Sequence, residues 1–116
     1  MNVFYTNRFV PKGSAGCARG PLIFIRPEYK NDVGLLAHED VHVRQWCRTL
    51  GLHSFMYLLS DSYKLACEVE AYQAQAKHYP DDRTPQFAVF IADDYGLDIS
   101  SVEALKLIRA HPEKSP

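Results

Sequence analysis

The chain has 116 residues, of which 47% are hydrophobic and 23% are charged, and its formal net charge is −1. That length suits one domain with a modest core, and the composition is ordinary for a globular protein. The sequence has no basic excess, no apolar leader and no run of about 18–20 apolar residues, so it points away from nucleic-acid binding, secretion and membrane insertion. We expect a single domain over residues 1–116.

The sequence contains three cysteines, Cys17, Cys47 and Cys67. An odd number without a Cys-x-x-Cys pair argues against a disulfide framework. Cys47 and Cys67 fall in mostly apolar helical patterns, so we expect both in the core, where free cysteines are often found. Taken together, these features predict a reduced, cytoplasmic protein, which we expect to be a monomer.

The N-terminal part of the chain predicts a small β-sheet. Residues 3–10 (VFYTNRFV) are rich in β-branched and aromatic side chains, which favour a strand. Residues 11–20 contain three glycines and predict a flexible loop. Residues 22–26 (LIFIR) predict another strand, and because Pro21 and Pro27 bracket it we expect it to be short and to lie at a sheet edge.

A long helix is predicted next, over about residues 33–50. Asn31 or Asp32 can accept hydrogen bonds from its first free amides, and Gly51 can end it. Its apolar positions recur at helical spacing, as expected for a helix that packs on a core.

The rest of the chain also predicts helices. The second runs over about residues 54–78 and is expected to break or bend at residues 60–62. The third spans residues 85–96, with Pro85 in its first turn. Ser100 and Glu103 form a capping-box pattern for the last one.

The predicted fold class is therefore α+β: a small N-terminal sheet of two or three short strands followed by about four helices. Residues 111–116 (HPEKSP) are expected to fray at the C-terminus.

The segment His38-Glu39-Asp40-Val41-His42 is a His-Glu-x-x-His pattern within the first long helix. Residues four apart on a helix lie about 40° apart around its axis, so both imidazoles point the same way and Glu39 lies in the same quadrant. Two histidines so placed can bind zinc, while a carboxylate beside them can act as a general base. The pattern predicts a zinc site formed by His38 and His42, with Glu39 as the catalytic base.

Catalytic zinc usually has a third protein ligand and one open position. Glu68 and Glu70 lie on the second predicted helix among small and apolar neighbours. Because they are about 200° apart around the helix, only one of them can face the metal. A buried carboxylate needs a partner, which a metal ion would supply. Glu68 is the preferred ligand, and His53 is an alternative.

These motifs resemble those of the gluzincin class of zinc metallopeptidases. The element Glu68-Val69-Glu70-Ala71, 26 residues after His42, is similar to the third-ligand helix of the prenyl-protein-processing and heat-shock gluzincins. The small size and the strand-plus-helix plan resemble the minigluzincins. The resemblance covers about residues 22–78. It implies that Glu68 is the third zinc ligand, and that residues 22–26 form an edge strand that holds a peptide substrate in extended form. The alternative for residues 22–26 is a plain core strand.

The chain departs from those relatives at Tyr72, where they usually carry an Asp that supports a metal-bound histidine. Another side chain must then orient the histidines, and Gln45, Asp40 or Tyr72 are the candidates. Tyr72 lies one helical turn after Glu68 and is the preferred donor to the oxyanion of the reaction. The remaining candidate donors are Tyr57, Tyr63, Tyr79, His53 and His78.

The sequence thus predicts a zinc-dependent metallopeptidase acting on a peptide or protein substrate, with His38, His42 and Glu68 as metal ligands and Glu39 and Tyr72 as catalytic residues. The main alternative is a zinc-stabilised zincin-like binding or assembly module with little hydrolysis. A third interpretation is a helical interaction domain with a chance His-Glu-x-x-His. Cys17, in the predicted loop, is expected to be a free surface thiol; the alternative is a thiolate that occupies the metal's open position.

Overall fold

The computed structural model describes residues 2–110 and has three strands followed by five α-helices. The strands are β1 (Asn2–Tyr5), β2 (Gly16–Arg19) and β3 (Leu22–Ile25), and a 3₁₀ turn covers Pro27–Tyr29. The helices are α1 (Val33–Arg48), α2 (His53–Leu59), α3 (Asp61–Ala76), α4 (Thr84–Asp94) and α5 (Ser101–Arg109). The predicted α+β class is confirmed. The expectation for residues 111–116 lies outside the described residues.

The sheet differs from the prediction at three places, and the first is that the strand expected over residues 3–10 covers only Asn2–Tyr5. Its order is β1-β3-β2, with β1 parallel and β2 antiparallel to β3. The prediction that β3 lies at an edge is wrong: Pro21 and Pro27 both fall outside the strand, so each of its four residues keeps the amide that pairing requires.

The prediction of a flexible loop over residues 11–20 is also wrong for its second half, because β2 forms there. The glycines that suggested a loop have local roles. A Cβ on Gly16 would lie 3.0 Å from the carbonyl oxygen of Phe24, so the close approach of β2 to β3 requires glycine. Gly20 adopts φ +59° at the hairpin turn.

Helix α1 begins and ends as predicted. The carboxylate of Asp32 accepts a hydrogen bond from the amide of Leu35 at 3.0 Å. Leu50 and Gly51, in the left-handed region, follow the last helical turn. Cys67 is buried as expected, but the same prediction for Cys47 is wrong, because its side chain is exposed near the end of α1.

The second predicted helix is two helices, divided where a break was expected. Ser60 has extended φ and ψ, and its hydroxyl accepts from the amide of Tyr63, which starts α3. Pro85 lies in the first turn of α4 as predicted. The capping box of Ser100 and Glu103 at the start of α5 is confirmed.

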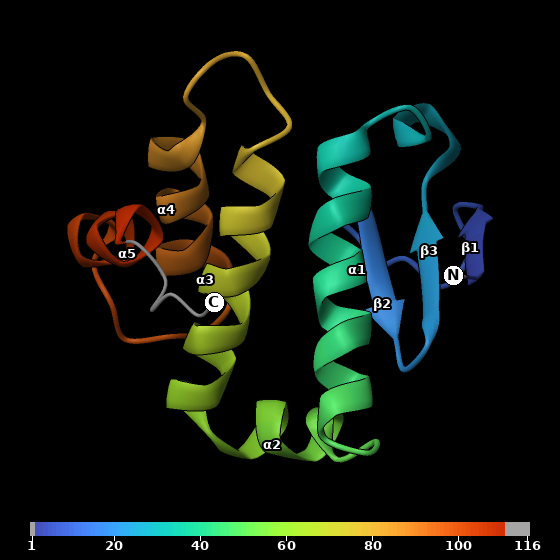
Figure 1. Ribbon diagram of the computed structural model, residues 1–116, viewed down its shortest axis with the longest axis horizontal. Coiled ribbons are helices and arrows are strands. Elements are labelled where there is room, and N and C mark those ends of the chain that lie inside the picture. Colours follow the sequence, from blue (N-terminus) through green and yellow to red (C-terminus); the bar gives the residue numbers. More distant parts are fainter. Residues whose placement is uncertain (1, 111–116) are drawn as a thin grey trace.

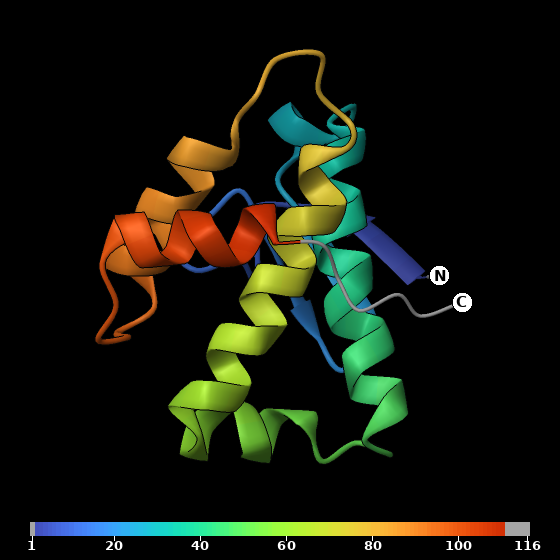
Figure 2. The same ribbon diagram turned by 60° about the vertical axis from the view of Figure 1, so that its left-hand side comes forward.

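Helix α1 lies between the sheet and the other long helices (Figure 1). On one side, Leu35 packs with Ile23 and Ile25 of the sheet. On the other side α1 runs beside α3, and α3 packs with α4 and α5, which crosses over both of them (Figure 2). This second core is formed by Tyr72, Phe87, Ala88, Ile91, Leu97, Ala104 and Ile108. The predicted metal ligands therefore come from the two helices at the centre of the molecule.

None of the helices between residues 2 and 110 combines the length and the apolar character that a membrane-spanning segment requires.

Candidate metal centre and cleft

Helix α1 places His38 and His42 one turn apart with their rings on the same side. The Nε2 atoms of the two imidazoles are 3.2 Å apart. His38 is buried and His42 is nearly so, and both face α3. The two ring nitrogens that converge are thus the pair that the sequence spacing predicted.

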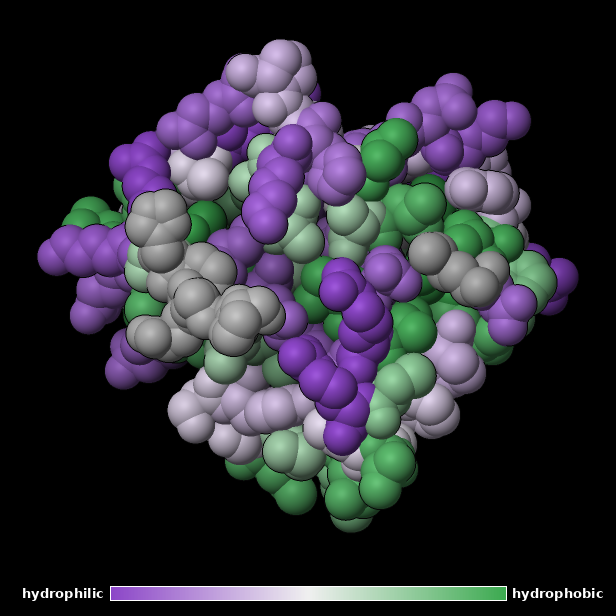
Figure 3. Space-filling model, viewed as in Figure 1, coloured by the Kyte–Doolittle hydropathy of each residue, from purple (hydrophilic) through white to green (hydrophobic). Residues whose placement is uncertain are grey.

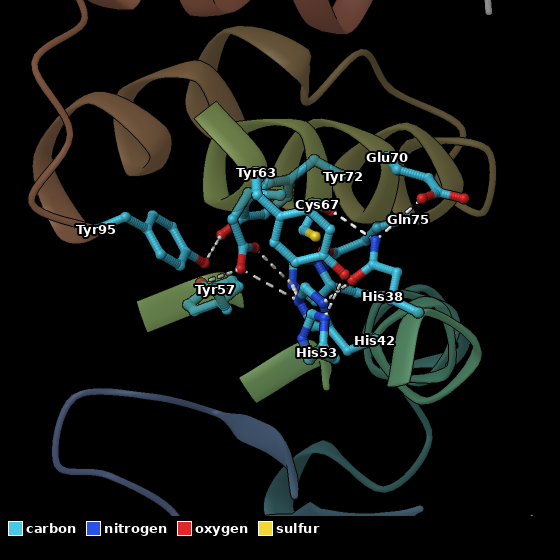
Figure 4. A network of polar contacts seen from close by, with 12 residues as sticks. His38, His42, His53, Tyr57, Tyr63, Cys67, Glu70, Tyr72, Gln75 and Tyr95 are labelled. Atoms are coloured by element: carbon cyan, nitrogen blue, oxygen red, sulfur yellow. Dashed lines mark hydrogen bonds and ion pairs between the residues drawn. The ribbon is translucent and has the colours of Figure 1, made fainter. Parts of the chain in front are cut away.

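Glu68 of α3 completes the group. Its Oε1 lies 3.4 Å from Nε2 of His38, and its Oε2 lies 3.3 Å from Nε2 of His42. Only 2% of Glu68 is exposed. Tyr57 of α2 donates a short hydrogen bond of 2.5 Å to Oε2, whereas Oε1 has no hydrogen-bond partner among the described residues. Figure 4 shows His38 and His42 of α1 and Tyr57 of α2 converging on this group.

The geometry of this group fits a metal ion. Ligand atoms at zinc–ligand distances of 2.0–2.1 Å and tetrahedral angles lie about 3.3–3.4 Å from one another. The two Nε2 atoms lie 3.2 Å apart, close to that edge length, and each lies near a different oxygen of the Glu68 carboxylate, at 3.4 Å for His38 and 3.3 Å for His42. A buried carboxylate oxygen without a partner is costly, and a cation would satisfy it. Among the described residues, these three are the group whose ligand atoms lie close enough to hold an ion.

A chain of hydrogen bonds holds His38 from behind, and we call it the His38 branch. Nδ1 of His38 contacts Oε1 of Gln75 at 2.9 Å, and Nε2 of Gln75 donates to the hydroxyl of Tyr79 at 3.0 Å. Tyr79 in turn donates to Asp32 at 2.7 Å. Because the Asp32 carboxylate only accepts, every donor in the chain is fixed, and His38 carries its proton on Nδ1.

A second set of bonds, the His42 branch, holds the other ligand. Nδ1 of His42 contacts Oε1 of Gln45 at 2.8 Å. Nε2 of Gln45 donates to the backbone carbonyl of Cys67 at 3.1 Å and to Glu70 at 3.0 Å. Arg48 holds Glu70 from the solvent side at 2.9 Å. Both amide protons of Gln45 are used, so its oxygen must accept, and His42 also carries its proton on Nδ1.

The two branches together point both Nε2 lone pairs at Glu68. Of the predicted orienting residues, Gln45 has this role. Asp40 instead pairs with Arg44 at 3.4 Å, and Tyr72 packs its ring edge-on against His38. Gln75 was not predicted; its signal was its position seven residues after Glu68, on the same face of α3.

Charge and burial act against each other in this group. Burial by itself would raise the pKa of Glu68, but the adjacent His42 and His38 lower it below its usual range. Burial by itself would lower the pKa of His42, but the Glu68 carboxylate raises it. In the metal-free protein the anionic carboxylate therefore favours a proton on His42, which a metal ion must displace.

Glu39 lies beside the two histidines on α1 and lines the cleft next to the metal group. Only 5% of the residue is exposed. Burial raises the pKa of Glu39, although the charges of His38 and His42 oppose the change. A carboxylate with a raised pKa is a stronger base than one in water, which suits a role in proton transfer.

The cleft has a volume of about 470 Å³ and lies between β2, α1 and α2. All four residues of β2 line it, and β2 is an edge strand of the sheet. Its other wall includes Trp46, His53, Tyr57 and Leu58, with Glu68 and Tyr95 behind. The metal group thus sits beside a strand whose outer edge is free to pair.

Several side chains could donate to a substrate in this cleft. Tyr72 is buried in the helical core and is not among the lining residues, but its hydroxyl contacts that of Tyr95 at 2.8 Å, and Tyr95 does line the cleft. His53 and Tyr57 line it as well. His53 contacts the Tyr63 hydroxyl at 2.9 Å and is not part of the metal group. Tyr95 was missed from the sequence because it follows α4, and only the folded chain brings it to the site.

Cys17 lines the cleft but is not part of the metal group. Its thiol donates to the carbonyl of Phe9 at 3.1 Å, and burial raises its pKa. In this arrangement the thiol is held by the backbone of the preceding loop.

A comparison with known protein families, curated protein sequences and solved structures finds no significant match to this chain. Its function must therefore be inferred from the site itself.

Proposed function

We propose that this chain is a zinc-dependent metallopeptidase in which His38, His42 and Glu68 bind the metal. The observation that carries the proposal is the buried Oε1 of Glu68, which has no hydrogen-bond partner among residues 2–110 and lies 3.4 Å from Nε2 of His38. Two histidines and one glutamate are a donor set typical of catalytic zinc, which keeps one coordination position open. When bound, zinc would polarise the substrate carbonyl and acidify a water molecule.

The substrate in this proposal is a peptide in extended form. The role that the sequence assigned to residues 22–26 passes to β2, because β3 pairs on both sides and β2 has the free edge beside the cleft. Backbone hydrogen bonds to β2 would hold the peptide without regard to its side chains. The cleft volume of about 470 Å³ is of the size expected for a ligand site.

The protein's own residues carry the proton transfers. Glu39 accepts a proton from the attacking water and returns it to the leaving amine, and its raised pKa favours the first of these steps. Tyr95 and His53, which both line the cleft, would donate hydrogen bonds to the developing oxyanion. Tyr72 would act through its contact with the Tyr95 hydroxyl.

The test compares the wild type with Glu39→Gln, which keeps the shape of the side chain and removes its basicity. Both proteins are loaded with zinc, analysed for metal content and incubated with a peptide library. We expect one zinc per chain in both proteins and cleavage by the wild type, with a loss of about 10²-fold or more in the variant. If both proteins bound the same amount of zinc and neither cleaved any peptide, the result would contradict the peptidase and favour the zinc-stabilised binding module.

A further inference from the structure

The segment from Leu50 to Leu59 contains no charged residue and leaves large apolar side chains in solvent. We define the α2 surface as Leu50, Leu52, Phe55, Met56, Leu58 and Leu59. Most of these side chains are more than half exposed, and Leu50 is 93% exposed. Figure 3 shows hydrophobic residues gathered at the end of the molecule where α2 lies.

The helical spacing of these residues makes them one continuous surface. Leu52, Phe55, Met56 and Leu59 recur at intervals of three and four along α2, so they share its outer face, and Leu58 flanks Phe55. Their exposed fractions correspond to roughly 700 Å² of apolar surface, which exceeds the patches that most monomers carry. Specific interfaces bury about 600–1,000 Å² per partner, so this surface falls within the range that can form one.

The backbone at Leu50 gives a second reason to assign the surface a role. Leu50 has φ 54°, a conformation that a branched side chain adopts only with strain. Phe9 also has a positive φ, but its carbonyl accepts bonds from Cys17 and Arg19 and its ring contacts Phe24. Leu50 has no packing of that kind, because its side chain projects into water. A glycine would fit the turn better, so the exposed leucine requires another explanation.

Charge around the surface favours a second copy of this chain as its partner. Arg48, before the surface, is paired with Glu70, and after it Asp61 is followed by Lys64. The rim is therefore balanced and offers no net attraction to an anionic membrane or a charged protein. An interface between identical patches brings like residues together, which an uncharged patch tolerates without repulsion.

We propose that the chain forms a two-fold dimer in which the α2 surfaces of two copies pack against each other. This departs from the monomer expected from the sequence and does not depend on the proposed peptidase activity. It has a consequence for the cleft, since α2 also contributes Tyr57 and Leu58 to its wall. Pairing through α2 would place the partner next to the mouth of the cleft and limit how a substrate can enter.

Sedimentation of the zinc-loaded chain over a range of concentrations tests the dimer. The wild type should approach twice its mass of 13.2 kDa as concentration rises. Phe55→Glu and Leu59→Glu, on exposed positions outside the cleft, should each weaken association at least about tenfold. Val102→Glu on α5 is the matched control, because Val102 is exposed to 63% and Phe55 to 65%, and it should behave as the wild type. Circular dichroism and zinc content establish that the variants are folded.

Three results would overturn the proposal. The first is a wild type that stays at 13.2 kDa up to its highest soluble concentration. The second is a dimer whose dissociation constant is the same in Phe55→Glu and Leu59→Glu, which would place the interface elsewhere. The third is a protein that stays monomeric but co-floats with phosphatidylcholine vesicles and loses this binding in both variants, which would make a lipid surface the partner.

Discussion

The His38 branch and the His42 branch use the same side chain, a glutamine amide, but anchor it differently. Gln75 has one anchor, the Tyr79 hydroxyl, which depends in turn on Asp32. Gln45 has two anchors at once, the backbone carbonyl of Cys67 and the carboxylate of Glu70. In the His38 branch each hydrogen bond depends on the next one along the chain of residues. In the His42 branch two independent hydrogen bonds hold the same amide. Loss of one bond should therefore matter more in the His38 branch.

The difference also shows how the chain can orient both histidines with Tyr72, and not an Asp, at position 72. A neutral amide orients each histidine, so no carboxylate other than Glu39 and Glu68 needs to be buried near the metal. The anchoring charges lie further out, on the half-buried Asp32 and on Glu70, whose side chain is 45% exposed. Supporting residues of this kind usually contribute tenfold to a hundredfold in metal affinity.

Among changes to the two branches, we expect the largest loss of zinc affinity when the amide of Gln75 or of Gln45 is removed. Gln75→Leu and Gln45→Leu each leave a buried Nδ1–H of a histidine without an acceptor, so we expect zinc affinity to fall by about 10–100-fold in both. Competition against a chromogenic zinc chelator measures the change. Gln86→Leu, at an exposed position on α4, is the control and should bind zinc as the wild type does. Unchanged affinity in both variants would mean that the amides do not orient the ligands.

Breaking the single anchor of the His38 branch should have the next largest effect. Tyr79→Phe removes the hydroxyl that accepts from Gln75 and keeps the ring under the Arg83 guanidinium, 3.8 Å from the ring centroid. Gln75 then becomes free to turn, and we expect a loss of about tenfold in zinc affinity in the same competition assay. Tyr5→Phe, at an exposed position on β1, provides the matched control. A Tyr79→Phe affinity equal to that of the control would show that Gln75 is held without this anchor.

The substitution Gly34→Ala should displace the Tyr79 hydroxyl, the same anchor of Gln75, without removing a polar group. A Cβ on Gly34 would meet the Tyr79 ring and hydroxyl at 2.5 Å, so Gly34→Ala should push Tyr79 away from Gln75. Alanine also favours the helix by about 1 kcal/mol, which offsets part of the strain. We expect zinc affinity to fall severalfold while the thermal stability of the metal-free protein changes little. A variant with wild-type affinity would separate Tyr79 from the metal site.

We expect the smallest loss of zinc affinity when one of the two hydrogen bonds that hold Gln45 is removed. Glu70→Ala removes the contacts of Glu70 with Gln45 and Arg48 but leaves the bond from Gln45 to the Cys67 carbonyl. We expect less than about threefold change in zinc affinity, because the remaining acceptor keeps the amide in place. If Glu70→Ala lowered zinc affinity as much as Tyr79→Phe does, the second hydrogen bond of Gln45 would give the His42 branch no advantage over the His38 branch.

Local signals were sufficient to predict the helical segments and to select the three residues that converge in the candidate metal group. Asp32, Ser60 and Ser100 act on amides within three residues, and the spacing of His38 and His42 is set by the helix itself. Features that depend on pairing between distant segments were not predicted. The glycines of β2 indicate a loop when taken alone, and only its pairing with β3 makes residues 16–19 a strand.

The supporting residues were harder to predict than the ligands. A glutamine on a helix is usually a surface residue, and only its place on the same helix face as Glu68 distinguishes Gln75 from Gln73 two positions earlier. Tyr95 lies 27 residues after Glu68 and reaches the cleft only because α4 packs on α3. The chemistry of a ligand is visible in its own residue type, whereas the role of a supporting residue depends on what the fold places beside it.

Zinc titration of chelator-stripped protein is the most direct test of the metal centre, with Glu68→Ala and Glu70→Ala measured beside the wild type. The two glutamates lie two residues apart on α3, but only Glu68 faces the histidines. We expect the wild type and Glu70→Ala each to bind one zinc per chain. We expect the zinc affinity of Glu68→Ala to be lower than that of the wild type by at least about 10²-fold. A wild type that binds no zinc, or a Glu68→Ala variant that binds it as tightly as the wild type, would contradict the proposed site.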